Sequence, residues 1–138
     1  MNRVVLDAGA FDTIQTAAGK RLRDLLARTL IRGGEVCCAA VTLAEVARGT
    51  ARTRQVESAL SRRYGAEQIR VLVTDEEMAK LVGRILHAAN KGSASIADAH
   101  VIAACLPAEV AVVITTDPDD INELASVVPG VRIMSRTP

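Results

Sequence analysis

Aromatic side chains are almost absent from this sequence, which contains one phenylalanine (Phe11), one tyrosine (Tyr64) and no tryptophan. Proteins that bind single-stranded nucleic acid by stacking its bases need several such side chains, so this class of binding platform is excluded. Should the chain bind nucleic acid, its contacts are expected to be with the phosphate backbone instead.

An excess of charge of one sign is also lacking, because 17 basic and 16 acidic side chains leave a formal net charge of +1. The chain as a whole therefore has no general attraction for polyanions. Nine arginines nevertheless fall between residues 21 and 63, and they fit either solvated helix faces or a phosphate-contacting face. They are Arg21, Arg23, Arg28, Arg32, Arg48, Arg52, Arg54, Arg62 and Arg63.

The sequence has no apolar run of the ~18 residues that a membrane helix needs. Its N-terminal apolar run is too short for a signal peptide, because it breaks at Asp7. The three cysteines lack the spacing of a zinc site, and the adjacent Cys37 and Cys38 would point to opposite faces of a strand. With Cys105, they are interpreted as buried apolar residues of a cytoplasmic protein in a reducing compartment.

What the sequence does contain is an alternation of short β-branched runs with longer helical stretches. This alternation predicts βαβ units, an α/β fold and a mainly parallel sheet. A length of 138 residues fits one domain covering residues 1–138. The predicted strands are 4–7, 35–40, 69–73, 110–115 and 131–134, and the predicted helices are 11–18, 20–32, 42–49, 53–64, 74–89, 95–106 and 119–125.

Four acidic residues are placed so that they can meet at one end of this sheet. Asp7 ends the first strand, Glu45 follows the second by one helical turn, Asp98 begins the helix before the fourth, and Asp117 follows the fourth. Ligands of open parallel sheets bind beyond the carboxyl ends of the strands. Clustered carboxylates repel one another unless cations lie among them, and they suit Mg²⁺ or Mn²⁺. The pattern therefore favours metal-assisted phosphodiester hydrolysis.

Each acid except Asp7 also has a structural explanation. A charge that ends an apolar strand needs a partner, whereas an acid near a helix start can serve as a cap. Asp117 can belong to a turn that opens a helix, with Asp119 as an alternative cap. Three segments fit the capping-box pattern: Thr42-x-x-Glu45, Ser95-x-x-Asp98 and Thr74-x-x-Glu77. For Thr74-x-x-Glu77, capping is the preferred interpretation.

The two histidines are interpreted as ordinary surface or hydrogen-bonded residues rather than as metal ligands. His100 lies two residues after Asp98, so the two side chains face different sides of a helix. His87 lies within a long helix, half-exposed. No serine or cysteine has a paired base motif, so a covalent nucleophile is not expected.

Four segments resemble, in order, the acidic motifs of PIN-domain nucleases: 4–10, 42–49, 96–104 and 113–121. The chain has the size of VapC-type toxins, the ribonuclease halves of bacterial toxin–antitoxin pairs. One departure is Asp12, where relatives usually continue with apolar residues, and we interpret it as a surface charge.

The resemblance implies a three-layer α/β/α PIN-like domain with a central, mostly parallel sheet. It implies an Mg²⁺- or Mn²⁺-dependent endoribonuclease, a homodimer, and a cognate VapB-type antitoxin that docks in the acidic groove. Thr115 and Thr116 would donate hydrogen bonds to the acids. By motif position, the catalytic metal ligands would be Asp7, Glu45, Asp98 and Asp117, with Asp119 as a fifth metal ligand and Asp120 able to share the role of Asp117.

The hypothesis is therefore an endoribonuclease that leaves a 3′-hydroxyl and a 5′-phosphate. The alternative is a catalytically silent PIN-like binding module, against which the complete acidic set argues. A receiver domain is set aside because no lysine follows Lys91. A haloacid dehalogenase-type phosphatase is set aside because Gly9 stands where a second aspartate would be needed.

Overall fold

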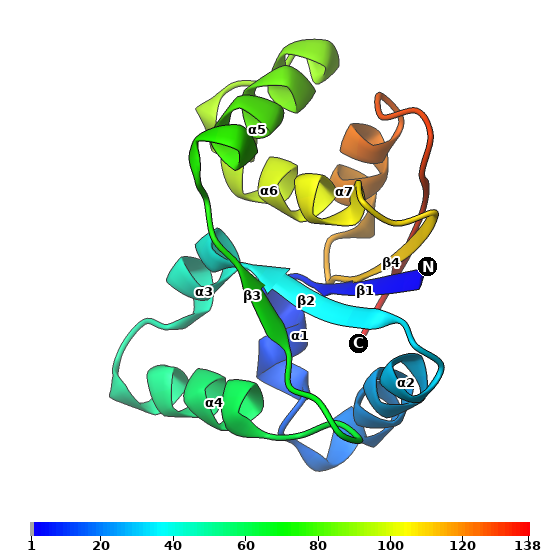
Figure 1. Cartoon of the computed structure of the whole chain (residues 1–138). Coiled ribbons are helices and arrows are strands. Elements are labelled where there is room, and N and C mark those ends of the chain that lie inside the picture. The colour runs from blue at the N-terminus through cyan, green and yellow to red at the C-terminus, as the bar shows by residue number, and fades with distance from the viewer. Residues whose placement is uncertain (1) are drawn as a thin grey trace.

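A five-stranded parallel sheet forms the centre of the computed structural model, which describes residues 2–138 (Figure 1). Residue 1, with which the expected domain begins, lies outside them. The strand order is β3-β2-β1-β4-β5, and every pair is parallel, as the alternating pattern predicted. The strands are β1 (Asn2–Leu6), β2 (Glu35–Ala39), β3 (Arg70–Leu72), β4 (Val110–Ile114) and β5 (Arg132–Arg136).

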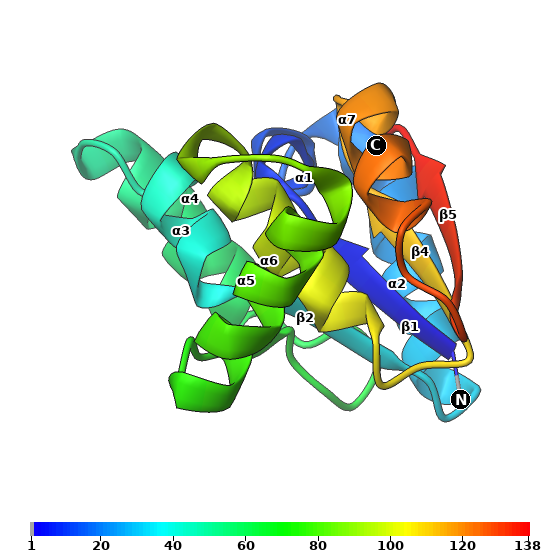
Figure 2. The same cartoon turned by 90° about the horizontal axis from the view of Figure 1, so that it is seen from above.

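Helices cover both faces of the sheet and give three layers (Figures 1 and 2). One face carries α1 (Ala8–Thr13), α2 (Lys20–Ile31) and α4 (Thr50–Ser61). The other carries α5 (Glu76–Ala89), α6 (Ile96–Cys105) and α7 (Pro118–Ala125). The remaining helices are α3 (Ala40–Val46) and the 3₁₀ turns η1 (Ala17–Gly19) and η2 (Ser93–Ser95). The predicted α/β/α architecture is confirmed.

Two apolar cores result from the alternation of side chains along the strands. In β1, Val4 and Leu6 belong to the core on the α2 side, whereas Val5 belongs to the core on the α6 side. The last seven residues of α6 are all buried, because this helix lies between the sheet, α5 and α7. A helix with apolar residues on nearly every side is stable only when it is buried. Because α6 is packed on all sides, its first turn, which contains Asp98, is fixed relative to the sheet.

The cysteines lie where the sequence placed them. All three are buried and free. Cys37 belongs to the core on the α6 side and Cys38 to the core on the α2 side, so the adjacent pair does point to opposite faces of the sheet. The interpretation as small apolar core residues is confirmed.

Four predicted helix starts were wrong by two or three residues, among them that of α5, which was expected at residue 74 and begins at Glu76 after its cap Asp75. The first helix begins at Ala8 rather than at residue 11, because Asp7 caps it directly at the end of β1. The helix expected from residue 42 begins at Ala40, and the one expected from residue 53 begins at Thr50. Neither has a side-chain cap, so no local signal marks its first residue. Within residues 2–138, no helix combines the length and the apolarity needed to cross a membrane.

Candidate active site: an acidic cluster at the carboxyl edge of the sheet

Asp7 lies at the carboxyl end of β1 and is buried, with 7% of its surface exposed. Its backbone N–H donates to the carbonyl of Ile114 at 2.9 Å, which continues the β1–β4 pairing by one residue. Its Oδ1 accepts a 2.8 Å hydrogen bond from the N–H of Ala8, and its Oδ2 accepts one of 2.7 Å from the hydroxyl of Thr115. Both oxygens are thus held in place, which supplies the partners that a buried carboxylate needs.

Thr115 connects this carboxylate to the turn that precedes α7. Its fully buried hydroxyl donates to Asp7 and accepts a 2.9 Å hydrogen bond from the N–H of Asp117. Thr116 lies differently: it is exposed, and its methyl group would be 2.5 Å from a Cβ added at Gly9. The structure therefore places Thr115 as a hydrogen-bond donor to Asp7. The expected donor role of Thr116 was wrong, and this residue is instead the contact that requires glycine at position 9.

Asp98 occupies the first turn of α6 and has the most strongly altered carboxyl group of the site. Its pKa is raised from 3.8 to about 6, mainly by burial. Ser95 precedes α6 without a side-chain capping bond, so the capping-box alternative for this acid was wrong. The remaining rise in the pKa of Asp98 comes from the negative charges of Asp7, Asp120, Glu45 and Asp117, in that order. Charges that affect the pKa of one carboxyl group must lie near it, so the side chains of these four acids lie around Asp98.

Glu45 comes to the same region from α3. Partial burial raises the pKa of its carboxyl, the charge of Asp7 raises it further, and Arg48 opposes both. Thr42 lies inside α3 rather than before it, and its buried hydroxyl has no hydrogen-bond partner among residues 2–138. The capping box Thr42-x-x-Glu45 was therefore wrong, and Glu45 is left available to the site.

The fourth position is occupied by a pair of acids rather than by one. Asp117 precedes α7 and makes no side-chain capping bond. Its pKa is raised chiefly by a hydrogen bond with Asp120, and further by burial and by the charges of Asp120, Asp7 and Asp119. Asp120 also acts on Asp98, whereas no such effect of Asp119 is seen. From the sequence, Asp119 was preferred to Asp120 as the additional metal ligand. The signal that favours Asp120 is its i, i+3 spacing from Asp117 in the first turn of a helix.

The other candidate residues lie apart from the acids. The cap of α5 is Asp75, whose Oδ1 accepts from the N–H of Met78 at 2.8 Å, so Thr74 was the wrong residue for that role. Asp12 forms a surface ion pair with Arg52, as expected of a surface charge. His87 is exposed.

His100 is buried rather than lying at the surface. Its Nδ1 donates to the carbonyl of Ile96 at 2.7 Å. Its Nε2 has no partner among residues 2–138, so only one ring nitrogen fits the interpretation of a hydrogen-bonded histidine.

Thr115 and Thr42 offer a matched pair of buried hydroxyls. Replacing Thr115 by valine is expected to lower the free energy of unfolding by about 1–3 kcal/mol, because Asp7 Oδ2 and the N–H of Asp117 would lose their partner. Thr42→Val should leave it unchanged or raise it, because that hydroxyl is buried without a partner. Urea unfolding of both variants tests this, and equal losses would contradict the role given to Thr115.

We call Asp7, Glu45, Asp98, Asp117 and Asp120 the acidic cluster. Within residues 2–138, no group of three or more His, Cys, Asp or Glu side chains is already arranged to hold a metal ion. The donors still fit a hard divalent cation, because all are carboxylates and three have pKa values raised in part by their neighbours. A cation would relieve this repulsion as the side chains draw together around it.

Comparison with known proteins identifies the family. The PIN domain model matches residues 4–127, a range that includes the whole acidic cluster. The chain belongs to the PIN-domain family. Among solved structures, this PIN domain is similar to a chain of DNA-bound VapBC from Salmonella typhimurium, with a TM-score of 0.56, 19% sequence identity and coverage of 98% of both chains. At that identity the likeness concerns the fold. No curated protein matches the sequence.

Proposed function

We propose that this PIN domain is a metal-dependent endoribonuclease and the toxin of a VapBC-type toxin–antitoxin pair. The observation that carries the proposal is the placement of Asp7 at the end of β1, Glu45 in α3, Asp98 in the first turn of α6 and the Asp117–Asp120 pair at the start of α7, close enough for their charges to add to the effect of burial on the pKa of Asp98. PIN domains are in general nucleases, and carboxylate clusters of this kind suit phosphodiester hydrolysis.

Mg²⁺ or Mn²⁺ would be held by Asp7, Asp98, Glu45 and the Asp117–Asp120 pair. When bound, the cation supplies charge neutralisation at the phosphate and lowers the pKa of water. Asp7 is fixed by Ala8 and Thr115 before any ligand arrives, so little side-chain freedom is lost on binding. The reaction is hydrolysis of the bond between phosphorus and the 3′ oxygen, which leaves a 3′-hydroxyl and a 5′-phosphate.

The remaining expectations are part of the same proposal. A VapB-type antitoxin is the proposed partner, in line with the likeness in fold to a VapBC complex. A homodimer, a single domain over residues 1–138 and a cytoplasmic location are proposed with it, and three buried, free cysteines are consistent with a reducing compartment.

Controlled expression in a bacterial host tests the toxin proposal. The wild-type chain is expected to arrest growth and to produce new 5′-phosphate ends in cellular RNA, whereas Asp7→Asn should do neither. Asp75→Asn is the matched control, because Asp75 caps α5 outside the acidic cluster. Growth arrest that persists in Asp7→Asn would refute the proposal. Binding of a partner without any RNA cleavage would instead support the catalytically silent module.

A further inference from the structure

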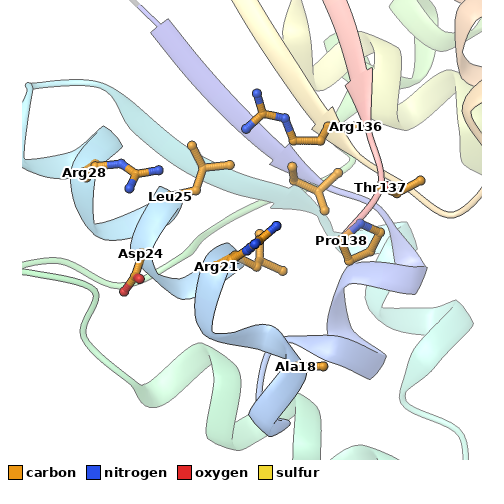
Figure 3. A pocket seen from close by; sticks show the side chains of 10 residues that line it. Ala18, Arg21, Asp24, Leu25, Arg28, Arg136, Thr137 and Pro138 are labelled. Atoms are coloured by element: carbon orange, nitrogen blue, oxygen red, sulfur yellow. The ribbon is translucent and has the colours of Figure 1, made fainter.

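A groove lies between α2 and the bare face of β4 and β5, beside the acidic cluster but lined by none of its carboxylates. It consists of two adjoining cavities of about 550 and 630 Å³, which share Leu25, Arg28 and Arg136 as lining residues. Figure 3 shows the first of them, with α2 on one side and the end of β5 on the other.

The groove exists because α2 does not extend over the whole sheet. This helix packs on β1 and β2, whereas α7 packs against β5 from the opposite face. The α2 side of β4 and β5 is thus left without a covering helix. Val112 and Met134 form part of its apolar floor, and Met134 is 39% exposed.

Arginines form both walls of the groove. Arg21 and Arg28 are seven residues apart on one face of α2, and Arg32 follows four residues later at the C-terminal cap of that helix. Arg136 lies on the opposite wall. None of these four side chains makes a hydrogen bond or an ion pair within residues 2–138. One acid, Asp24, also lines the first cavity; it is paired with Lys20, and the nearby charge of Arg28 also helps to lower its pKa.

Other arginines of the first half are occupied by structural bonds. Arg23 donates to the carbonyls of Ile14 and Thr16, and Arg52 pairs with Asp12. Arg62 donates to Gln15. The guanidinium groups of the groove make no such bonds, and they also gather along the same two cavities, so together they offer a row of positive charges to a ligand.

One end of the groove adjoins the acidic cluster. Ile114 lines the first cavity, and its carbonyl accepts the backbone hydrogen bond from Asp7 at 2.9 Å. From there the arginines follow α2 from Arg21 to Arg32, a distance of about 16 Å at a rise of ~1.5 Å per residue. A chain of negative charges lying along these arginines would reach the edge of the sheet at the cluster.

We propose that this arginine groove, defined by Arg21, Arg28, Arg32 and Arg136, binds the phosphate backbone of single-stranded RNA and leads the strand to the acidic cluster. Guanidinium groups bind phosphate in two-point contacts. The near absence of aromatic side chains requires such backbone contacts in place of base stacking. The choice of RNA as occupant rests on the proposed function.

Equilibrium binding of a fluorescein-labelled, mixed-sequence 20-nucleotide RNA tests this inference. The chain carries Asp98→Asn and the buffer contains EDTA, so that the RNA stays intact. Arg28→Gln with Arg136→Gln is expected to bind about tenfold more weakly, and the slope of log Kd against log salt should fall by about 1.4 for two lost phosphate contacts. Arg54→Gln with Arg84→Gln removes the same charge from α4 and α5, and should change neither quantity.

Several results would overturn the inference. They are unchanged RNA binding in the groove variant, an equal loss in the control variant, or no RNA binding by the unsubstituted groove. A groove variant that changes its molar mass in light scattering while RNA binding stays intact would assign the groove to a second copy of the chain. By contrast, RNA binding that depends on the groove, in a wild-type protein that never cleaves RNA, would contradict the proposed function alone.

Discussion

Replacing Asp98 by asparagine is expected to abolish RNA cleavage and, at the same time, to stabilise the fold. The side chain keeps its shape but loses the charge that would help to hold a cation, so the cleavage rate should fall by about a thousandfold or more. The stability should rise because the charged carboxyl is partly buried and faces the charges of Asp7, Asp120, Glu45 and Asp117.

The size and the pH range of this gain follow from the pKa of Asp98. A rise from 3.8 to about 6 corresponds to about 3 kcal/mol, and solvent screening of a half-buried group reduces it to about 1–2 kcal/mol. An acid with a raised pKa in the folded state costs nothing below pH 3.8 and destabilises increasingly up to about pH 6. The gain from Asp98→Asn should therefore be complete above pH 6 and absent near pH 3.8.

Urea unfolding in EDTA at pH 5 and pH 8 measures this effect. From pH 5 to pH 8, the free energy of unfolding of the wild-type protein should fall relative to that of Asp98→Asn. Asp75→Asn serves as the control, and it should leave stability nearly unchanged at both pH values, because asparagine caps a helix about as well as aspartate does. An Asp98→Asn variant that is less stable than wild type at pH 8 would show that the carboxylate is not held among repelling charges.

Mn²⁺ or Mg²⁺ is expected to raise the melting temperature of the wild-type protein at pH 8. An ion at a hundred times its Kd stabilises the folded state by about 2.7 kcal/mol, which is roughly 8 °C for a domain of this size. Below pH 6, protons compete for Asp98 and the shift should become much smaller. Differential scanning calorimetry at pH 5 and pH 8 measures both effects.

The matched control for this prediction is again Asp75→Asn, which should show the full shift, while Asp98→Asn should show almost none. Equal shifts in wild type and Asp98→Asn would place the ion outside the acidic cluster. No shift in wild type at millimolar Mn²⁺ would favour the binding module without catalysis.

The layers of the fold and the edge that carries the site were predictable from the sequence. Alternating β-branched runs indicate parallel strands, and Asp7 closes such a run, so its place at the carboxyl edge follows from local pattern alone. The buried, unpaired Cys37 and Cys38 followed from strand geometry in the same way.

Features that depend on where a helix begins were not predictable. The pattern Thr42-x-x-Glu45 indicates a cap only if the helix starts after Thr42, and α3 starts at Ala40 because the chain enters it directly from β2. The preference for Asp120 over Asp119 depends on the phase of α7 in the same way. The arginine spacing along α2 can be seen in the sequence, but the bare face of β4 and β5 opposite it follows only from the packing of the other helices.

Cleavage of a defined single-stranded RNA by purified protein tests the central claim most directly. Wild type, Asp7→Asn and Asp75→Asn are compared in EDTA and in Mg²⁺ under single-turnover conditions, and the ends of the products are analysed. The account predicts cleavage by wild type and Asp75→Asn in Mg²⁺ only, with 5′-phosphate ends, and none by Asp7→Asn. Cleavage by Asp7→Asn at the wild-type rate, or cleavage that continues in EDTA, would contradict it.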